Sequence, residues 1–174
     1  MKYYPPLSLL RSIFRLCAVA ILLCIITPLL QAQSPALIYA KAVNNSQPLG
    51  GYVQNRAVAV DASGNVFITG YFESLADFDP GAGVANLTAT GSTSIFLAKY
   101  DASGNYVFAK AIHGSNNGQG LAIAVDGAAN VYVSGNFAGT ADFDPGTGTV
   151  NLTSAGGSDI FLAKYTAAGN YLWA

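Results

Sequence analysis

The sequence predicts an all-β fold built from repeated β-sheets, and three observations support this prediction. The segment 61–109 aligns without a gap with the segment 126–174, and 27 of the 49 positions are identical. Short runs rich in β-branched and aromatic residues alternate with Asp, Gly and Asn clusters, which is the pattern of strands joined by turns. After residue 32, no segment combines a helical period of apolar residues with capping residues. The chain is therefore expected to hold two repeats of about 65 residues and pieces of their neighbours.

Residues 1–32 have the features of an N-terminal signal peptide helix, and they are set apart from the fold. Lys2, Arg11 and Arg15 give this segment a basic start. An uncharged apolar run then extends from Leu16 to Leu30, which is shorter than the roughly 20 residues that a membrane helix needs. A membrane anchor is the alternative to cleavage. We expect export to the cell surface or the medium, with no membrane span after cleavage.

The composition of the mature part, from residue 33 onward, excludes several classes of function. Both cysteines of the chain lie in the leader, so no disulfide is expected. Five basic residues stand against nine acidic ones in the mature part, which opposes binding to nucleic acid. The only histidine, His113, has no cysteine or histidine partner for a zinc site. It lies in a polar, glycine-rich connection between the repeats, and we assign it to a surface loop.

Each repeat is expected to contain four main strands in a fixed order. Two of the connecting turns, "DASGN" and "DGAAN", are of the kind that joins hairpin strands. The second strand carries a glycine suited to a bulge or to a close backbone approach. The expected strands are AVAV, VFITGYF, IFLAKY and YVFAKAI from residues 57, 66, 95 and 106, and AIAV, VYVSGNF, IFLAKY and YLWA from residues 122, 131, 160 and 171.

The third strand indicates how the sheets pack. Phe96 and Tyr100 lie on one of its faces and Ile95 and Leu97 on the other, so a sheet of such strands must be covered on both faces. The radially arranged blades of a β-propeller meet this demand. A repeat of about 65 residues exceeds the usual blade, and the stretch from "ADFDPG" to "NLT" accounts for the excess as an added hairpin or excursion. An open β-solenoid is the rival architecture, although its units are generally shorter.

We place the first repeat at about residues 44–110 and the second at about 111–174. Propellers close with 4 to 8 blades, so two repeats predict an incomplete propeller that closes only with further blades or with another chain.

The blocks "ANVYVSG", "DIFLAKY" from Asp159 and "GNYLWA" resemble the SBBP family of bacterial β-propeller repeats. The resemblance covers the chain from about Ile38 to Ala174. It implies an exported bacterial protein with blades of the seven-bladed propeller type, often part of a large surface or secreted protein. It does not imply any single activity.

The motif "ADFDPG" occurs at residues 76–81 and 141–146, and it has two interpretations. In the favoured one, Pro80 and Gly81 form the centre of a type II turn whose backbone donates hydrogen bonds to Asp79, and the second repeat does the same. In the other, paired carboxylates on an extended strand bind calcium, although two are few for an ion that takes 6 to 8 oxygens. The calcium candidates are Asp77, Asp79, Asp142 and Asp144.

Recurrence is the main indication of function. A residue that appears once in each repeat fits stacking better than catalysis, because a catalytic site is normally single and asymmetric. We therefore expect a non-catalytic structural or interaction module that binds a protein or a polysaccharide. No cofactor is expected, and calcium is the one candidate. Two alternatives stay open: a fragment of a secreted hydrolase or lyase that acts on polysaccharide, and a calcium-dependent adhesin.

Overall fold

The computed structural model of the protein describes residues 40–45 and 52–174. All regular secondary structure within these residues is β, and every described strand belongs to the unit Tyr39–Ala174. The predicted signal peptide of residues 1–32 lies outside the described residues. The described part of the chain contains no helix that is long and apolar enough to cross a membrane.

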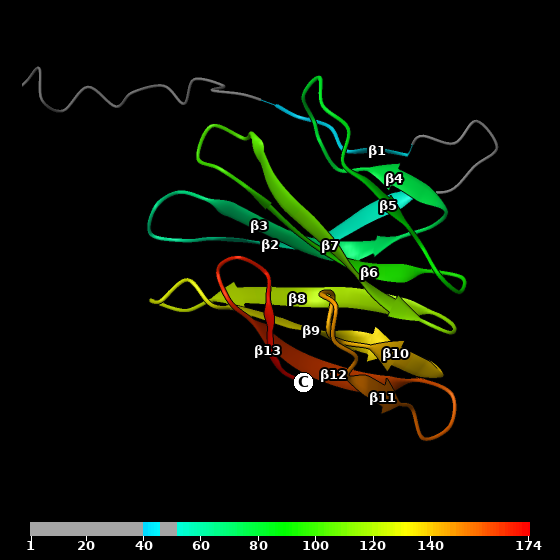
Figure 1. The fold of residues 1–174 in the computed structure, drawn as a ribbon. Coiled ribbons are helices and arrows are strands. Elements are labelled where there is room, and N and C mark those ends of the chain that lie inside the picture. The colour runs from blue at the N-terminus through cyan, green and yellow to red at the C-terminus, as the bar shows by residue number, and fades with distance from the viewer. Residues whose placement is uncertain (1–39, 46–51) are drawn as a thin grey trace, which may run out of the picture. The chain divides into compact units, whose positions relative to one another are not determined.

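Two four-stranded antiparallel sheets form the body of the described unit (Figure 1). We call them blade 1 and blade 2. Blade 1 contains β2 (Val53–Val60), β3 (Val66–Phe72), β6 (Ser94–Tyr100) and β7 (Tyr106–Gly114). Blade 2 contains β8 (Gly118–Val125), β9 (Val131–Phe137), β12 (Asp159–Tyr165) and β13 (Tyr171–Trp173). The predicted fold class, all-β with propeller-like blades, is confirmed, and β7 runs through the repeat boundary placed at residues 110–111.

Each repeat also forms the small hairpin that the sequence predicts, between its second and third main strands. The hairpins are β4 (Leu75–Asp77) with β5 (Asn86–Thr88), and β10 (Thr140–Asp142) with β11 (Asn151–Thr153). The hairpin of the second repeat pairs with the preceding blade, because β10 is hydrogen bonded to the end of β7. Blade 1 is thereby extended to a sheet of six strands.

The hairpin of the first repeat has the same kind of neighbour. It pairs with β1 (Asn44–Asn45), where Asn44 lies opposite Asp77. In the second repeat, His113 of β7 lies opposite Asp142 in the same way. The segment 40–45 therefore occupies the place of the last strand of a preceding blade.

The main core lies between the two blades. Strand β8 lies against β2 and β3, and the close approach depends on Gly120. A Cβ atom there would collide with the hydroxyl oxygen of Thr69 and would lie 3.2 Å from Ile95. Blade 1 contributes Phe67, Ile95, Leu97 and Ile112 to this core, and blade 2 and its hairpin contribute Val131, Val133, Phe137, Ala141, Phe143, Phe161, Ala163 and Tyr165.

The phenylalanine of each "ADFDPG" motif anchors its hairpin to the blade. The Phe78 ring packs on Phe72 and Phe96, with centroids 5.6 and 5.0 Å away. Phe143 packs on Phe137 and Phe161 with the same geometry, at 5.4 and 4.9 Å. Phe78 and Phe143 are fully buried, so the recurring motif fixes the hairpin to the sheet.

A glycine in the second strand of each blade accommodates a bulge, as the sequence predicts. In blade 1 the register shifts between Asn55 and Ala57, opposite Gly70, and a Cβ atom on Gly70 would collide with the carbonyl oxygen of Gln54. Gly135 has the same relation to Gln119 in blade 2. The glycine is required because the two backbones touch.

Candidate functional site

The aspartates of the first "ADFDPG" motif bind the backbone of their own turn. The Asp77 carboxylate accepts hydrogen bonds from the Asp79 and Ala85 N–H groups at 3.0 and 2.8 Å. The Asp79 carboxylate accepts one from the Gly81 N–H at 2.7 Å. These bonds close the hairpin loop between β4 and β5.

The second motif repeats the arrangement. Asp142 accepts hydrogen bonds from the N–H groups of Asp144 and Val150 at 3.1 and 2.8 Å, and Asp144 accepts one from Gly146 at 2.8 Å. The four calcium candidates therefore hold two turns in the same way.

The predicted type of the turn is wrong. A type II turn needs a positive φ at the glycine after proline, and neither Gly81 nor Gly146 has one. The carboxylate itself explains the glycines of the loop, since a Cβ atom on Gly83 would collide with the Asp79 Oδ2 atom. The Asp79 carboxylate accepts the hydrogen bond of a loop N–H group that a backbone carbonyl would accept in an ordinary turn.

In each repeat a buried tyrosine forms a hydrogen bond with the backbone of the hairpin loop. The Tyr100 hydroxyl donates to the Phe78 carbonyl at 3.0 Å, and the Tyr165 hydroxyl donates to the Phe143 carbonyl at 3.1 Å. Burial raises the pKa of both tyrosines, with smaller contributions from a neighbouring tyrosine and from the motif's carboxylates. Within residues 40–45 and 52–174, no three His, Cys, Asp or Glu side chains gather as a metal site, and calcium binding stays a prediction.

A second recurring turn joins paired strands within the blades. In "DASGN", Asp61 Oδ1 accepts from the backbone N–H groups of Ser63 and Asn65, both at 2.9 Å, and its Oδ2 accepts from the Asn65 side chain at 2.8 Å. These bonds lower the pKa of Asp61. Asp101 and Asp126 head equivalent turns, and the pKa of Asp126 falls to about 2, chiefly through its bond to the Asn130 side chain.

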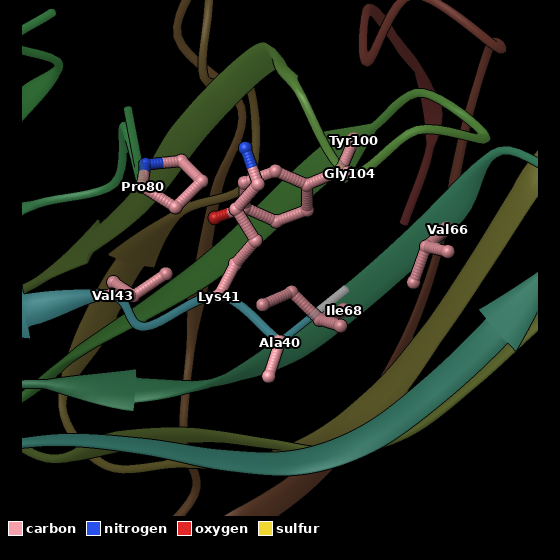
Figure 2. Close-up of a pocket in the computed structure, with 8 residues that line it drawn as sticks. All are labelled: Ala40, Lys41, Val43, Val66, Ile68, Pro80, Tyr100 and Gly104. Atoms are coloured by element: carbon pink, nitrogen blue, oxygen red, sulfur yellow. The ribbon is translucent and has the colours of Figure 1, made fainter. Parts of the chain in front are cut away.

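A pocket of about 220 Å³ lies where blade 1 meets the segment 40–45 (Figure 2). Lys41 and Val43 border it on one side, and Ile68 and Tyr100 border it on the other. In the second repeat Gly169 is the equivalent of Gly104, and the Phe108 ring would lie 2.8 Å from a Cβ atom on it. The residue that matches Phe108 in the first repeat is Tyr39, which lies outside the described residues.

His113 lies elsewhere than predicted. It is exposed, as expected, but it belongs to β7 and pairs with Asp142 of β10. The glycines that follow it lie within strands, Gly114 in β7 and Gly118 and Gly120 in β8, and only residues 115–117 link the two strands.

One polar and aromatic cluster was missed because it does not recur. We call it the Tyr52 cluster: Tyr52, Gln54, Arg56, Tyr71 and Glu73. The Tyr52 and Tyr71 rings meet edge to face at 5.6 Å, and the Arg56 guanidinium lies 5.3 Å above the Tyr71 ring. The Tyr71 hydroxyl donates to the Gln54 side chain at 2.8 Å and accepts from Arg56 at 3.2 Å.

Three residues of this cluster are exposed, whereas Tyr71 is only 5% exposed. Tyr52 is 42% exposed, and the side chains of Gln54 and Arg56 are exposed as well. Its hydrogen bond with Glu73 raises the pKa of Tyr52. The equivalent positions of blade 2 hold Asn117, Gln119, Leu121, Asn136 and Ala138, so only the glutamine is shared. The departure from the repeat was the signal that could have revealed the cluster.

No protein-family model matches the chain. The chain is similar to the uncharacterized WD repeat-containing protein L264 of Acanthamoeba polyphaga mimivirus, at 33% identity over 143 residues that cover 69% of this chain and 10% of that protein. It is also similar to the regulatory protein FlaEY of Caulobacter vibrioides, at 28% identity over 83 residues, or 48% of this chain and 9% of that protein. The chain spans about a tenth of the length of these curated relatives. The similarity to a WD repeat-containing protein and the two blades both indicate a propeller-like repeat protein. Membership of the SBBP family stays a prediction.

Proposed function

We propose that the protein is an exported, non-catalytic interaction module that binds its partner through the Tyr52 cluster. The observation that carries this proposal is the contrast between the two repeats. The aspartates of both repeats hold equivalent turns, whereas the Tyr52 cluster appears once and leaves Tyr52, Gln54 and Arg56 exposed. A recurring residue serves the scaffold, and a residue that breaks the repeat on the surface is free to serve recognition.

The chemistry of the cluster favours a protein partner. Tyrosine and arginine are enriched among the residues that dominate protein interfaces, because each offers a large, rigid or planar surface with polar groups at its edge. Here the Arg56 guanidinium is held by the Tyr71 ring and hydroxyl, which reduces the side-chain freedom that binding would remove. The cluster is thus preorganised before any partner arrives.

The test compares the cluster with its counterpart in blade 2. Tyr52→Ala and Arg56→Ala are made in the full chain, with Leu121→Ala as the matched control at the position equivalent to Arg56. Each variant is immobilised and exposed to the envelope and secreted proteins of the native host. We expect discrete proteins that are retained by the wild type and by Leu121→Ala and lost from both cluster variants.

The same variants separate the competing functions. Electrophoresis through gels that contain surface polysaccharides would show retardation dependent on Tyr52 if the ligand is a glycan, and that outcome would replace the protein partner. Release of new sugar ends from those polysaccharides would overturn the non-catalytic role. Recovery of the native chain only from the cytoplasm, with its first 32 residues intact, would overturn export.

A further inference from the structure

The Tyr52 cluster stays exposed although the blade that faces it is in place. Phe67 and Tyr71 lie on the same face of β3, because successive side chains of a strand alternate between its faces. Phe67 belongs to the core between the blades, and β8 of blade 2 lies against β2 and β3. On this covered face Tyr71 is 5% exposed, whereas Tyr52 and Arg56 remain exposed. The accessible groups therefore lie beside an interface between blades that is already formed.

Arg56 occupies the bulge of β2. The register shifts between Asn55 and Ala57, so Arg56 is the extra residue that has no partner on β3. Leu121 is the extra residue of the same bulge in β8. A bulge takes a side chain out of the alternation of the strand and re-aims it, often next to a functional site. Both blades thus contain the bulge, and blade 1 uses it to present a cation.

Tyr71 holds the Arg56 guanidinium in one orientation. Its ring lies 5.3 Å from the guanidinium carbon, and its hydroxyl accepts a hydrogen bond from one guanidinium nitrogen at 3.2 Å. The same hydroxyl donates its proton to the Gln54 side chain at 2.8 Å, which leaves its oxygen to accept from Arg56. The bond to Tyr71 uses one of the five N–H donors of the arginine. Within residues 40–45 and 52–174 the other donors have no hydrogen-bond partner, so they are available to a ligand.

No acidic residue of the chain forms an ion pair with Arg56. All nine acidic residues lie in the described part of the chain, because residues 1–39 and 46–51 contain none. Eight of the nine accept hydrogen bonds from the backbone of their own turns or loops, and the ninth, Glu73, shares a hydrogen bond with Tyr52. The ion pair found among the described residues joins Lys164 and Asp126. A carboxylate for Arg56 must therefore come from another molecule.

The charges of the Tyr52 cluster fit a ligand group with a single negative charge. Arg56 is its one cation, and Glu73 adds a negative charge. A phosphate group carries nearly two negative charges and favours several arginines, and Glu73 would repel it. A carboxylate matches one guanidinium, because the two groups can form two parallel N–H···O bonds. The exposed Tyr52 ring lies in the same cluster and offers an apolar surface.

We propose that the Tyr52 cluster binds an acidic side chain of its partner, with the carboxylate held by the fork of the Arg56 guanidinium. An apolar residue next to that acidic residue packs on the exposed ring of Tyr52. The recognised feature is thus a peptide segment in which Asp or Glu neighbours an apolar residue. This inference rests on the proposed function and names the chemistry that the partner must offer.

The test uses Arg56 as its own reporter. Arg56 is the only arginine after residue 32, and its Nε–Hε signal in nuclear magnetic resonance spectra is identified by its loss in Arg56→Lys. The full chain is titrated at neutral pH with acetyl-Phe-Glu-amide, with acetyl-Phe-Gln-amide and with inorganic phosphate. We expect the glutamate peptide to shift the Arg56 signal and to bind at least about tenfold more tightly than either of the other two probes.

Two exposed substitutions separate the guanidinium fork from its charge and from its position. Arg56→Lys keeps the charge and loses the planar fork, so it should bind the glutamate peptide about tenfold more weakly, as read from the backbone amide signals of β2. Leu121→Arg is the matched control. It places an arginine on the equivalent bulge of blade 2, where Asn136 stands in place of Tyr71, and the new arginine should not respond to the peptide.

Three results would overturn the inference. They are equal binding of the glutamate and glutamine peptides, undiminished binding by Arg56→Lys, and phosphate binding tighter than that of the glutamate peptide. An equal response of the new arginine in Leu121→Arg would show that any exposed arginine suffices, and it would remove the role of the Tyr52 cluster.

The inference and the proposed function fail separately. Host proteins retained equally by the wild type and by Arg56→Lys, but lost from Tyr52→Ala, would leave the proposed function standing and remove the carboxylate. A selective response to the glutamate peptide, without any retained host protein, would instead remove the proposed protein partner alone.

Discussion

Ala129 occupies a backbone conformation that its side chain disfavours. Its φ is 61°, whereas the equivalent positions of the other three turns of this kind are Gly64, Gly104 and Gly169, with φ of 80°, 76° and 73°. A residue other than glycine in this region destabilises the folded state by about 1–2 kcal/mol. Glycine in turn stabilises the unfolded state by about 0.5–1 kcal/mol, because it gives the unfolded chain more conformational freedom. Ala129→Gly should therefore raise the free energy of unfolding by about 0.5–1 kcal/mol in urea denaturation.

The reverse change at the equivalent turn is the control. Gly64→Ala should lower stability, because the φ is unfavourable and the new Cβ atom would lie 3.2 Å from that of Ala102. An equal response of the two turns would contradict the conformational explanation.

The aspartates of these turns make stability depend on acidic pH. The pKa of Asp61, Asp101 and Asp126 is lower in the folded state than its usual value of 3.8, and it reaches about 2 for Asp126. Their stabilisation is complete above the unfolded pKa and is lost as pH falls from about 4 to about 2. The midpoint of urea unfolding should decrease over this interval.

Asp126→Asn should flatten that decrease, whereas substitution of Thr166 by Ser should leave it unchanged. Thr166 heads the fourth turn with a hydroxyl, which accepts from the Asn170 N–H at 3.1 Å without titrating. A pH profile identical in the wild type and in Asp126→Asn would exclude this carboxylate as a source of acid sensitivity.

The two aspartates of each hairpin motif should contribute unequally. Asp142 accepts two backbone hydrogen bonds from partly buried donors, and Asp144 accepts one in an exposed loop. Asp142→Ala should cost about 1–3 kcal/mol of unfolding free energy and Asp144→Ala less than about 1 kcal/mol. Calcium should leave both midpoints unchanged, and a calcium-dependent rise that Asp144→Asn abolishes would support the metal interpretation.

At the scale of the elements, the bulge of the first strand depends on one glycine in the second. Gly135→Ala would push a Cβ atom into the Gln119 carbonyl, and backbone cannot move aside as a flexible side chain can. We expect a loss of about 3 kcal/mol in unfolding free energy. Gly127→Ala has nothing within 4 Å of its new Cβ atom and should be neutral, so equal losses would contradict the steric reason.

The main strands could be predicted because their signals are local. Their β-branched and aromatic runs, the Asp/Gly/Asn turns and the strand glycines act over a few residues, and the repeat supplied a second copy of each. The pairing of β10 with β7 joins segments that are distant in sequence, so the role of His113 as a strand residue was hidden behind the glycines that follow it. The Tyr52 cluster was missed for the opposite reason, because a search for recurrence discards residues that occur once.

At the scale of the whole molecule, equivalent leucines test how much the contact between blades contributes. Leu97 is 1% exposed beneath blade 2, and Leu162 is 51% exposed on the outer face. Leu97→Ala should cost about 2–5 kcal/mol in dilute solution, and Leu162→Ala should cost clearly less. Urea unfolding of both variants measures the difference directly. Similar losses of unfolding free energy would mean that packing within the strand's own sheet, rather than burial beneath a neighbouring blade, determines the contribution of the leucine.

The hydrogen bonds between the β10–β11 hairpin and blade 1 have a mechanical consequence. A force that pulls blade 2 away from blade 1 must break the β10–β7 hydrogen bonds at the same time as it opens the apolar core between the blades. The hydrogen bonds and the apolar core carry the force at the same time, so both must break together. Under tension, successive repeats should therefore separate abruptly, in whole-repeat steps, and a chain of such repeats would act as a stiff spacer up to a sharp limit of force.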